Sequence, residues 1–288
     1  MLDKASENNQ TDNITPGGVG PTRDASNYRL VPQAALEWRY PLINHYGNDS
    51  MTIEPVVLAV AQAYGNNPAT ISNEDSRLLE LTDTNLFSLD RMPGLDIIDS
   101  GPRVAYGARG QYRFDRGTSI DGLLGQNYNP NSRTPFPNST VANEDFSDYI
   151  GRLAFTYSPV TFAYRFALDR ENMSANRNEV SFAFAKPWLS FLTSYRSIRN
   201  NRYVSDSKEG DIAMTLPIDD NWSIYGSARR NLTLDQFVST GSGIVFKNEC
   251  FNIGLDLVRI YTRDRDVEPT TQYMLHVAFK NLGEFGGN

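Results

Sequence analysis

Apolar and polar residues alternate with a period of two along many short stretches of this chain, and no other feature limits its fold as strongly. In residues 160–169 one set of positions is apolar, while Arg165 and small or polar residues fill the positions between. Because successive side chains of a strand point to opposite faces, such a stretch predicts a strand with one apolar and one polar face. The same pattern recurs at 104–114, 153–157, 180–184, 212–216, 251–257 and 273–279. The alternation predicts an all-β, antiparallel fold of about thirteen strands of roughly ten residues each.

The links between these strands alternate in length. Short links lie at 115–118, 158–159, 186–187, 218–220 and 247–249. Long polar links lie at 63–101, 128–148, 170–178, 197–209 and 262–270. Short turns on one side and long loops on the other are typical of a transmembrane β-barrel of the bacterial outer membrane. A soluble β-sandwich also alternates and has regular turns, so it stays an alternative.

The polar face of two strands is unusually basic. Arg109, Gln111 and Arg113 share one face of the 104–114 strand, and Arg165 lies on the polar face of the 160–169 strand. Guanidinium groups suit a water-filled lumen better than a packed core, because an unpaired buried charge is costly. We therefore expect these four side chains to face the lumen of a barrel.

The net charge and the ends of the chain further limit the class of protein to which this chain can belong. The net charge of −7 argues against a nucleic-acid partner, and no stretch of about 18 apolar residues could form a membrane helix. The amino terminus lacks the basic and apolar parts of a secretory signal, and complete bacterial barrels have an even number of strands. We expect residues 1–30 to be a largely disordered extracellular loop, and residues 31–283 to be the carboxyl-terminal part of a larger barrel.

Four motifs follow one another between Asn73 and Gly107. They are the run Asn73, Glu74, Asp75, Ser76; the run Asp83 to Phe87, which includes Asn85 and Leu86; the set Arg91, Gly94, Asp96; and the set Gly101, Arg103, Tyr106, Gly107. In order and spacing they resemble the carboxyl-terminal region of the LptD/OstA family of lipopolysaccharide-assembly proteins. The upstream sequence WRYPLI from Trp38 and the downstream sequence LLGQNYNP from Leu123 extend the resemblance.

The resemblance implies an outer-membrane barrel of about twenty-six strands that inserts lipopolysaccharide into the outer leaflet. In such a barrel the lumen passes the sugar, and a lateral gate between the first and last strands passes the lipid. Here the last strand would supply one side of the gate, with Thr271, Tyr273, Leu275, Val277 and Phe279. The amino-terminal jelly roll and the first half of the barrel are not present in this sequence.

The resemblance also implies partners: a plug lipoprotein (LptE-like), a periplasmic bridge protein (LptA-like) that binds the jelly roll, and the barrel-assembly machinery. A general outer-membrane porin or substrate channel is the alternative function, since it shares the alternation and the loops. The four ordered motifs favour a function in lipopolysaccharide assembly over a porin or substrate channel.

Cys250 is the only cysteine, so a disulfide within this chain is impossible. It lies in a short link, on the expected periplasmic side. Family members carry cysteine at this place and bond it to cysteines near their amino terminus, which makes Cys250 a disulfide candidate. Here Glu249 precedes a single cysteine, and an unpaired thiol remains the alternative.

No catalytic, metal or cofactor site is expected. His45 and His276 are the only histidines, and neither lies beside a motif for an activated nucleophile. The carboxylates between Glu74 and Asp99 have no metal-ligand spacing, so solvated or ion-paired loop residues are the simpler interpretation. One further hypothesis is that some of these carboxylates, Asp83 among them, organise the loop over the pore by pairing with lumen arginines such as Arg109 and Arg113.

Overall fold

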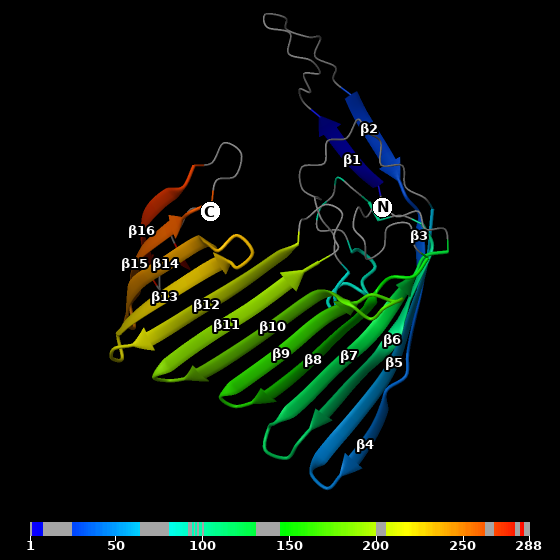
Figure 1. The fold of residues 1–288 in the computed structure, drawn as a ribbon, viewed down its shortest axis with the longest axis horizontal. Helices are drawn as coiled ribbons and strands as arrows, with labels where there is room; N and C mark the ends of the chain where they lie inside the picture. Colours follow the sequence, from blue (N-terminus) through cyan, green and yellow to red (C-terminus); the bar gives the residue numbers. More distant parts are fainter. Residues whose placement is uncertain are drawn as a thin grey trace, which may run out of the picture.

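The computed structural model describes residues 2–7, 25–63, 81–91, 94, 96, 98–99, 101–130, 145–199, 206–262, 268–279 and 283–284. These residues form strands, turns and loops, and every paired strand is antiparallel to its neighbour. Nearly all strands join one large curved sheet, in which each strand pairs with the next one along the chain (Figure 1). In the described part of the chain, no helix is long and apolar enough to cross a membrane.

The central strands of the sheet are nine to fourteen residues long, close to the length that spans an outer membrane. They are β5 (Asp49–Gln62), β6 (Arg103–Arg113), β7 (Ser119–Tyr128), β8 (Tyr149–Tyr157), β9 (Val160–Leu168), β10 (Ala175–Lys186), β11 (Leu189–Ile198), β12 (Ser207–Pro217), β13 (Trp222–Asn231), β14 (Gln236–Lys247), β15 (Phe251–Ile260) and β16 (Thr270–Phe279).

One edge of the sheet is an interrupted strand. Both β3 (Gln33–Arg39) and β4 (Leu42–Tyr46) pair with β5, and Pro41 lies between them. Proline has no N–H to donate to a sheet, which explains the break. If β3 and β4 are counted as one interrupted strand, the sheet has thirteen spanning strands. The prediction of an all-β, antiparallel fold is confirmed.

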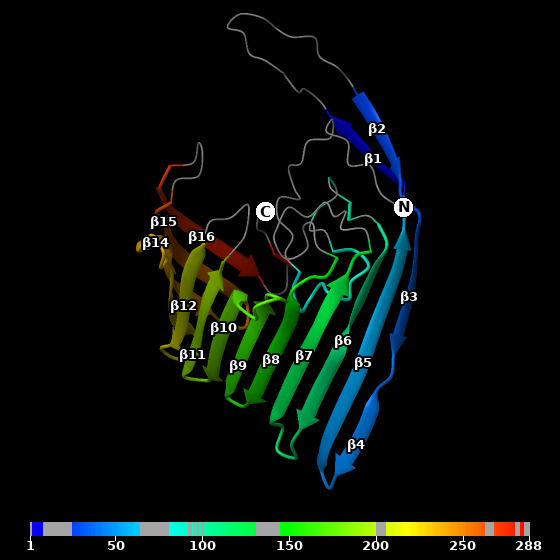
Figure 2. The same ribbon diagram turned by 45° about the vertical axis from the view of Figure 1, so that its right-hand side comes forward.

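The opposite edge is β16, which pairs with β15 along its whole length. On its other side only the two-residue β17 (Gly283–Glu284) pairs with it, at Ala278 and Phe279. The edge strands β3 and β16 do not pair with each other, so the sheet is open, as expected for part of a larger barrel. Figure 2 shows the resulting trough, with the two edges apart.

Links of unequal length lie at the two ends of the strands, as predicted, with two differences. The predicted long link 170–178 is shorter, because β9 ends at Leu168 and β10 begins at Ala175. On the side expected to be extracellular, β13 and β14 are joined by only four residues, 232–235. The sequence pattern missed this hairpin, because Leu232 and Leu234 continue the apolar character of the strands. Asn231 builds the turn instead: its side-chain oxygen accepts hydrogen bonds from the amides of Thr233 and Leu234 at 3.0 and 2.9 Å.

Residues 1–30 were expected to be largely disordered. Within this segment the structure describes β1 (Leu2–Glu7) and β2 (Ala25–Leu30), which pair antiparallel as a separate two-stranded sheet. The extracellular position of this segment stays a prediction.

The two faces of the large sheet differ in chemistry. One face, which we call the outer face, presents large apolar side chains to the surroundings, including Phe155, Phe162, Ile212, Leu255 and Leu275. The other, the inner face, carries arginines and carboxylates from most strands. Its Arg152 and Arg165 contact Asp83, which belongs to the part of the chain drawn in cyan within the trough (Figure 2). An apolar outside and a polar inside are the reverse of a soluble protein and match a membrane barrel.

Candidate functional site: the charged inner face

A single row of cross-strand neighbours runs over the inner face from β5 to β13. Its members are Glu54, Arg109, Leu123, Arg152, Arg165, Glu179, Arg196, Glu209 and Asn231, each directly opposite the next. We call this set the charged row. Opposite charges in direct register stabilise a sheet, and like charges destabilise it. Four of its eight steps join opposite charges: Arg165 pairs with Glu179 at 3.0 Å and Arg196 with Glu209 at 2.8 Å, for example, while three steps include the neutral Leu123 or Asn231.

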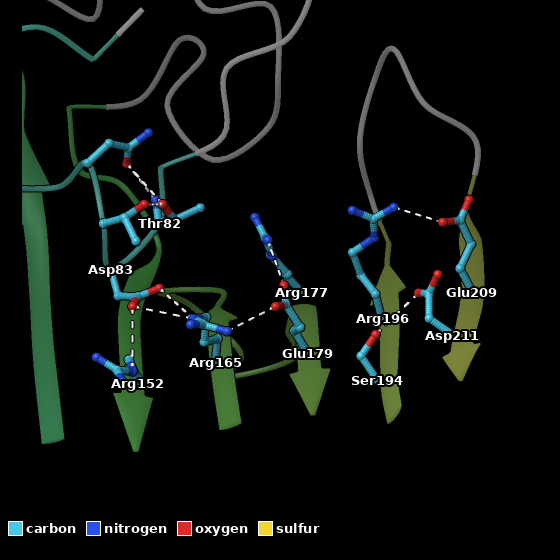
Figure 3. Close-up of polar contacts among 12 residues, drawn as sticks. Thr82, Asp83, Arg152, Arg165, Arg177, Glu179, Ser194, Arg196, Glu209 and Asp211 are labelled. Atoms are coloured by element: carbon cyan, nitrogen blue, oxygen red, sulfur yellow. Dashed lines mark hydrogen bonds and ion pairs between the residues drawn. The ribbon is translucent and has the colours of Figure 1, made fainter. Parts of the chain in front are cut away.

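The exception is the step from β8 to β9, where Arg152 and Arg165 are direct register partners. Asp83, from the connection between β5 and β6, supplies the missing negative charge. Its carboxylate lies 3.3 Å from Arg165 Nε and 3.9 Å from Arg152 Nε (Figure 3). The side chain of Asp83 is only 6% exposed, so it is largely withdrawn from water between the two guanidinium groups. Asp83 thus places a negative charge between the two like charges of the row.

Residues 81–91, which we call the inward segment, hold Asp83 in place by apolar packing. Leu81 and Leu86 are 2% and 1% exposed and form a core with Leu58 and Val60 of β5 and Ile150 of β8. Figure 2 shows this part of the chain, in cyan, within the trough. Burial of two leucines contributes about 3–6 kcal/mol, enough to hold a loop against the sheet.

A local turn shapes the inward segment around Asp83. The backbone N–H of Thr82 donates to the side-chain oxygen of Asn85 at 2.7 Å, and the N–H of Leu86 donates to the carbonyl of Thr82 at 3.0 Å. Asparagine favours such turns because its short side chain bonds to nearby backbone. The turn points Asp83 at the arginines while Leu81 and Leu86 enter the core.

A second, more deeply buried cluster fixes the end of the inward segment. Asp99 lies 2.6 Å from Arg91 and 3.3 Å from Arg103, and all three side chains are at most 8% exposed. Arg103 also donates to the carbonyl oxygen of Leu89 at 2.6 Å. A buried carboxylate with two arginines and backbone acceptors satisfies charges that would otherwise be expensive to bury.

A hollow of about 520 Å³ opens on the inner face beside Asp83. Its lining combines basic and acceptor groups: Thr52, Glu54, Asp83, Thr84, Arg109, Gly110, Gln111, Asp121, Gly122, Leu123 and Arg152. Two buried polar atoms of this lining have no hydrogen-bond partner among the described residues, Nε of Arg152 and Oε1 of Glu54. The lining therefore includes one guanidinium N–H and one carboxylate oxygen that are ion-paired at 3.9 Å but make no hydrogen bond with the described residues.

Near the β16 edge a third polar cluster lies on the inner face. The Tyr225 hydroxyl lies 2.5 Å from Asp256 Oδ1, and His276 Nδ1 lies 3.2 Å from Asp256 Oδ2. The two rings lie over Gly243 and Gly254, where any Cβ atom would meet ring atoms within 2.5 Å. No group of three His, Cys, Asp or Glu residues in the described ranges is placed to hold a metal ion.

The predicted site residues are distributed as follows. Arg109, Gln111, Arg113 and Arg165 belong to the inner-face positions of β6 and β9, and Arg109 lies 3.9 Å from Glu54 and over the ring of Phe87. Cys250 is exposed in the short link between β14 and β15. The expected gate residues lie at every second position of β16, and His276 occupies one of the positions between them. They are Thr271, Tyr273, Leu275, Val277 and Phe279. Asn73, Glu74, Asp75 and Ser76 lie outside the described residues.

Asp83 contacts inner-face arginines, and they are Arg152 and Arg165 rather than Arg109 and Arg113, the two examples given above. Sequence reasoning did not single out Arg152, Glu54, Glu179, Arg196 or Glu209. Alternation places each on the polar face of its strand, but only the register between strands shows that they form one row.

An open antiparallel sheet with an apolar outer face, a charged inner face and spanning-length strands defines a transmembrane protein of the β-barrel class. The family described as LPS transport system D matches residues 2–222, more than half of the chain. The chain belongs to this family, and its location is the bacterial outer membrane.

Two relatives illustrate the relationship. The LPS-assembly protein LptD of Aeromonas salmonicida (strain A449) is 23% identical over 92% of this chain and 34% of its own length. The LPS-assembly protein LptD of Vibrio cholerae is 23% identical over 81% of this chain and 32% of its own length. The chain thus spans about a third of the length of these curated relatives. Among solved structures, the copper transporter OprC aligns over 97% of this chain and 53% of its own, with a TM-score of 0.48 and 11% identity.

Proposed function

We propose that this chain forms part of an outer-membrane translocon that inserts lipopolysaccharide into the outer leaflet, with the inner face lining the path of the sugar. Membership of the LPS transport system D family is the observation that carries the proposal. The contrast between the two faces supports it, because a charged face accommodates a hydrated saccharide while the apolar face meets lipid. The chain acts as a conduit and performs no bond chemistry.

The lipid part of the molecule is proposed to leave through a lateral gate at β16. This strand is at the edge of the sheet, and from Thr270 to Val277 it has no second neighbour among the described strands. Backbone groups left unpaired in lipid cost several kcal/mol each, so a complete barrel needs another strand there. A weakly paired seam at this place would let an acyl chain pass sideways. Thr271, Tyr273, Leu275, Val277 and Phe279 would form its carboxyl-terminal side.

The partners proposed are lipopolysaccharide itself, a plug lipoprotein (LptE-like), a periplasmic bridge protein (LptA-like) and the barrel-assembly machinery. The bridge protein would bind an amino-terminal jelly-roll domain of the full-length protein. A plug in the lumen would contact the charged inner face, which includes the hollow of about 520 Å³.

Depletion of the full-length protein in its own organism tests the proposal. We expect lipopolysaccharide to disappear from the cell surface, measured by antibody binding to intact cells, and to return when the gene is re-expressed. Normal surface lipopolysaccharide after depletion would overturn the translocon and favour a general porin or substrate channel. Uptake of small hydrophilic solutes, measured in the same cells, identifies that alternative.

A further inference from the structure

The register of the sheet places two arginines side by side with a single carboxylate between them. Arg152 and Arg165 are directly opposed on β8 and β9, and Asp83 is the only acidic side chain with a described ion pair to Arg152. Like charges in direct register are destabilising, so the pair is costly unless an anion joins it. The sheet therefore contains an anion site that the chain fills with its own side chain.

The fit of Asp83 to this site is incomplete. The Asp83 carboxylate bonds to Arg165 but lies 3.9 Å from Arg152 Nε, and that buried nitrogen has no hydrogen-bond partner among the residues that the structure describes. Arg152 and Arg165 are 40% and 30% exposed, so both border solvent in the trough. A phosphate or carboxylate with more oxygens and free approach could bond to both guanidinium groups, as arginine favours.

The hollow next to the pair suits the remainder of a sugar. Glu54, Gln111 and Asp121 also line it, and each offers oxygens that accept hydrogen bonds from hydroxyl groups. Oε1 of Glu54 is buried and accepts no hydrogen bond from the described residues, although Arg39 and Arg109 each lie 3.9 Å away. Basic groups and acceptors in one lining match a saccharide that carries an acidic group.

We propose that Arg152 and Arg165 form a binding site for the phosphate or carboxylate group of an acidic saccharide, and that Asp83 occupies the site as an internal competitor. The inward segment would then be displaced as the saccharide arrives and would return after it leaves. This inference rests on the proposed function and names the part of the cargo that the inner face binds.

Full-length protein, purified from outer membranes in detergent, tests the site by calorimetric titration with glucosamine 6-phosphate, inorganic phosphate and glucosamine. The variant Asp83→Asn removes the competitor and keeps its size. We expect it to bind glucosamine 6-phosphate about tenfold more tightly than the parent protein, because the open site is no longer a minor state. Adding Arg165→Gln to this variant abolishes the gain.

Asp235→Asn is the matched control, because it makes the same change at an exposed carboxylate in the link between β13 and β14, which pairs with Arg230 and lies outside the charged row. Its affinity should stay within about twofold of the parent. Equal gains in Asp83→Asn and Asp235→Asn, or no gain in Asp83→Asn, overturn the proposal. Inorganic phosphate that binds as tightly as glucosamine 6-phosphate overturns its saccharide part, since a free anion would then suffice.

If Asp83→Asn does not assemble, Arg152→Gln and Arg165→Gln test the site in the parent background, where each must weaken binding of glucosamine 6-phosphate. An unchanged affinity in both variants overturns the proposal. The titration measures binding without transport, so the two proposals can fail separately. If the titration finds no site but depletion removes surface lipopolysaccharide, only this inference is wrong. Binding without that loss removes only the translocon.

Discussion

Gly125 of β7 lies directly beneath Leu86 of the inward segment: a Cβ atom at Gly125 would stand 2.7 Å from Leu86 Cδ2 and 2.8 Å from the carbonyl oxygen of Tyr106. The absence of a side chain at this one position lets Leu86 reach the sheet and become almost fully buried. The contact therefore links a glycine in a strand to the placement of Asp83, three residues before Leu86.

Gly125→Ala is expected to loosen the inward segment without breaking the sheet. The methyl group would meet both Leu86 and the backbone carbonyl of Tyr106 on β6, so the loop and the β6–β7 pairing must both shift, and such overpacking typically costs about 1–3 kcal/mol. We expect faster protease cleavage within residues 81–91 in outer-membrane vesicles. Gly122→Ala, on the same strand, is the control, because its Cβ atom would meet nothing closer than 3.9 Å. Equal cleavage rates in the two variants would show that Leu86 does not depend on Gly125.

The buried ion cluster is expected to contribute more to stability than any ion pair at the rim. Asp99→Asn leaves Arg91 and Arg103 buried without their shared carboxylate, and breaking such a pair typically costs about 3–5 kcal/mol. Asp235→Asn removes an 81% exposed partner of Arg230 and should cost about 0–1 kcal/mol. Urea unfolding of the full-length protein in detergent, followed by tryptophan fluorescence, compares the two. A larger loss in Asp235→Asn would contradict this ranking.

The sequence predicts the parts of this fold that depend on local alternation. Period two identified the strands and placed Arg109 and Arg165 on polar faces, because a side chain's face follows from its position within one strand. It could not show that Arg152 meets Arg165, since the stagger between neighbouring strands depends on turns and packing. The docking of Asp83 was equally out of reach, because it follows from burial of Leu81 and Leu86 against strands distant in sequence.

Local patterns also missed two irregular features. The interruption of the edge strand at Pro41 can be recognised only when β5 is known to pair with both β3 and β4. The short hairpin after Asn231 depends on side-chain bonds to two amides, which a count of polar residues cannot detect. In both places one residue with special hydrogen bonding overrides the pattern around it.

Cys250 offers a test of the disulfide that the sequence suggests. Its thiol is exposed in the short link between β14 and β15, so it is open to a partner from elsewhere in a longer protein. If it forms such a bridge, the full-length protein should migrate differently on non-reducing gels, and Cys250→Ser should remove that difference. Complete labelling of Cys250 by a maleimide in unreduced membranes would instead show an unpaired thiol.

The proposed gate at β16 predicts where newly made lipopolysaccharide first touches the outer face. Leu275 of β16 and Ile224 of β13 belong to one cross-strand row, through Leu255 and Ile244, and both side chains are exposed on the apolar face. A photo-crosslinking amino acid placed at each position therefore samples matched surroundings that differ in distance from the sheet edge. During a short pulse of labelled lipopolysaccharide, we expect crosslinks at Leu275 several times sooner than at Ile224, because only the edge position adjoins the seam. Simultaneous labelling at both positions would mean that the molecule reaches β16 from the surrounding membrane, and the gate would have to lie elsewhere.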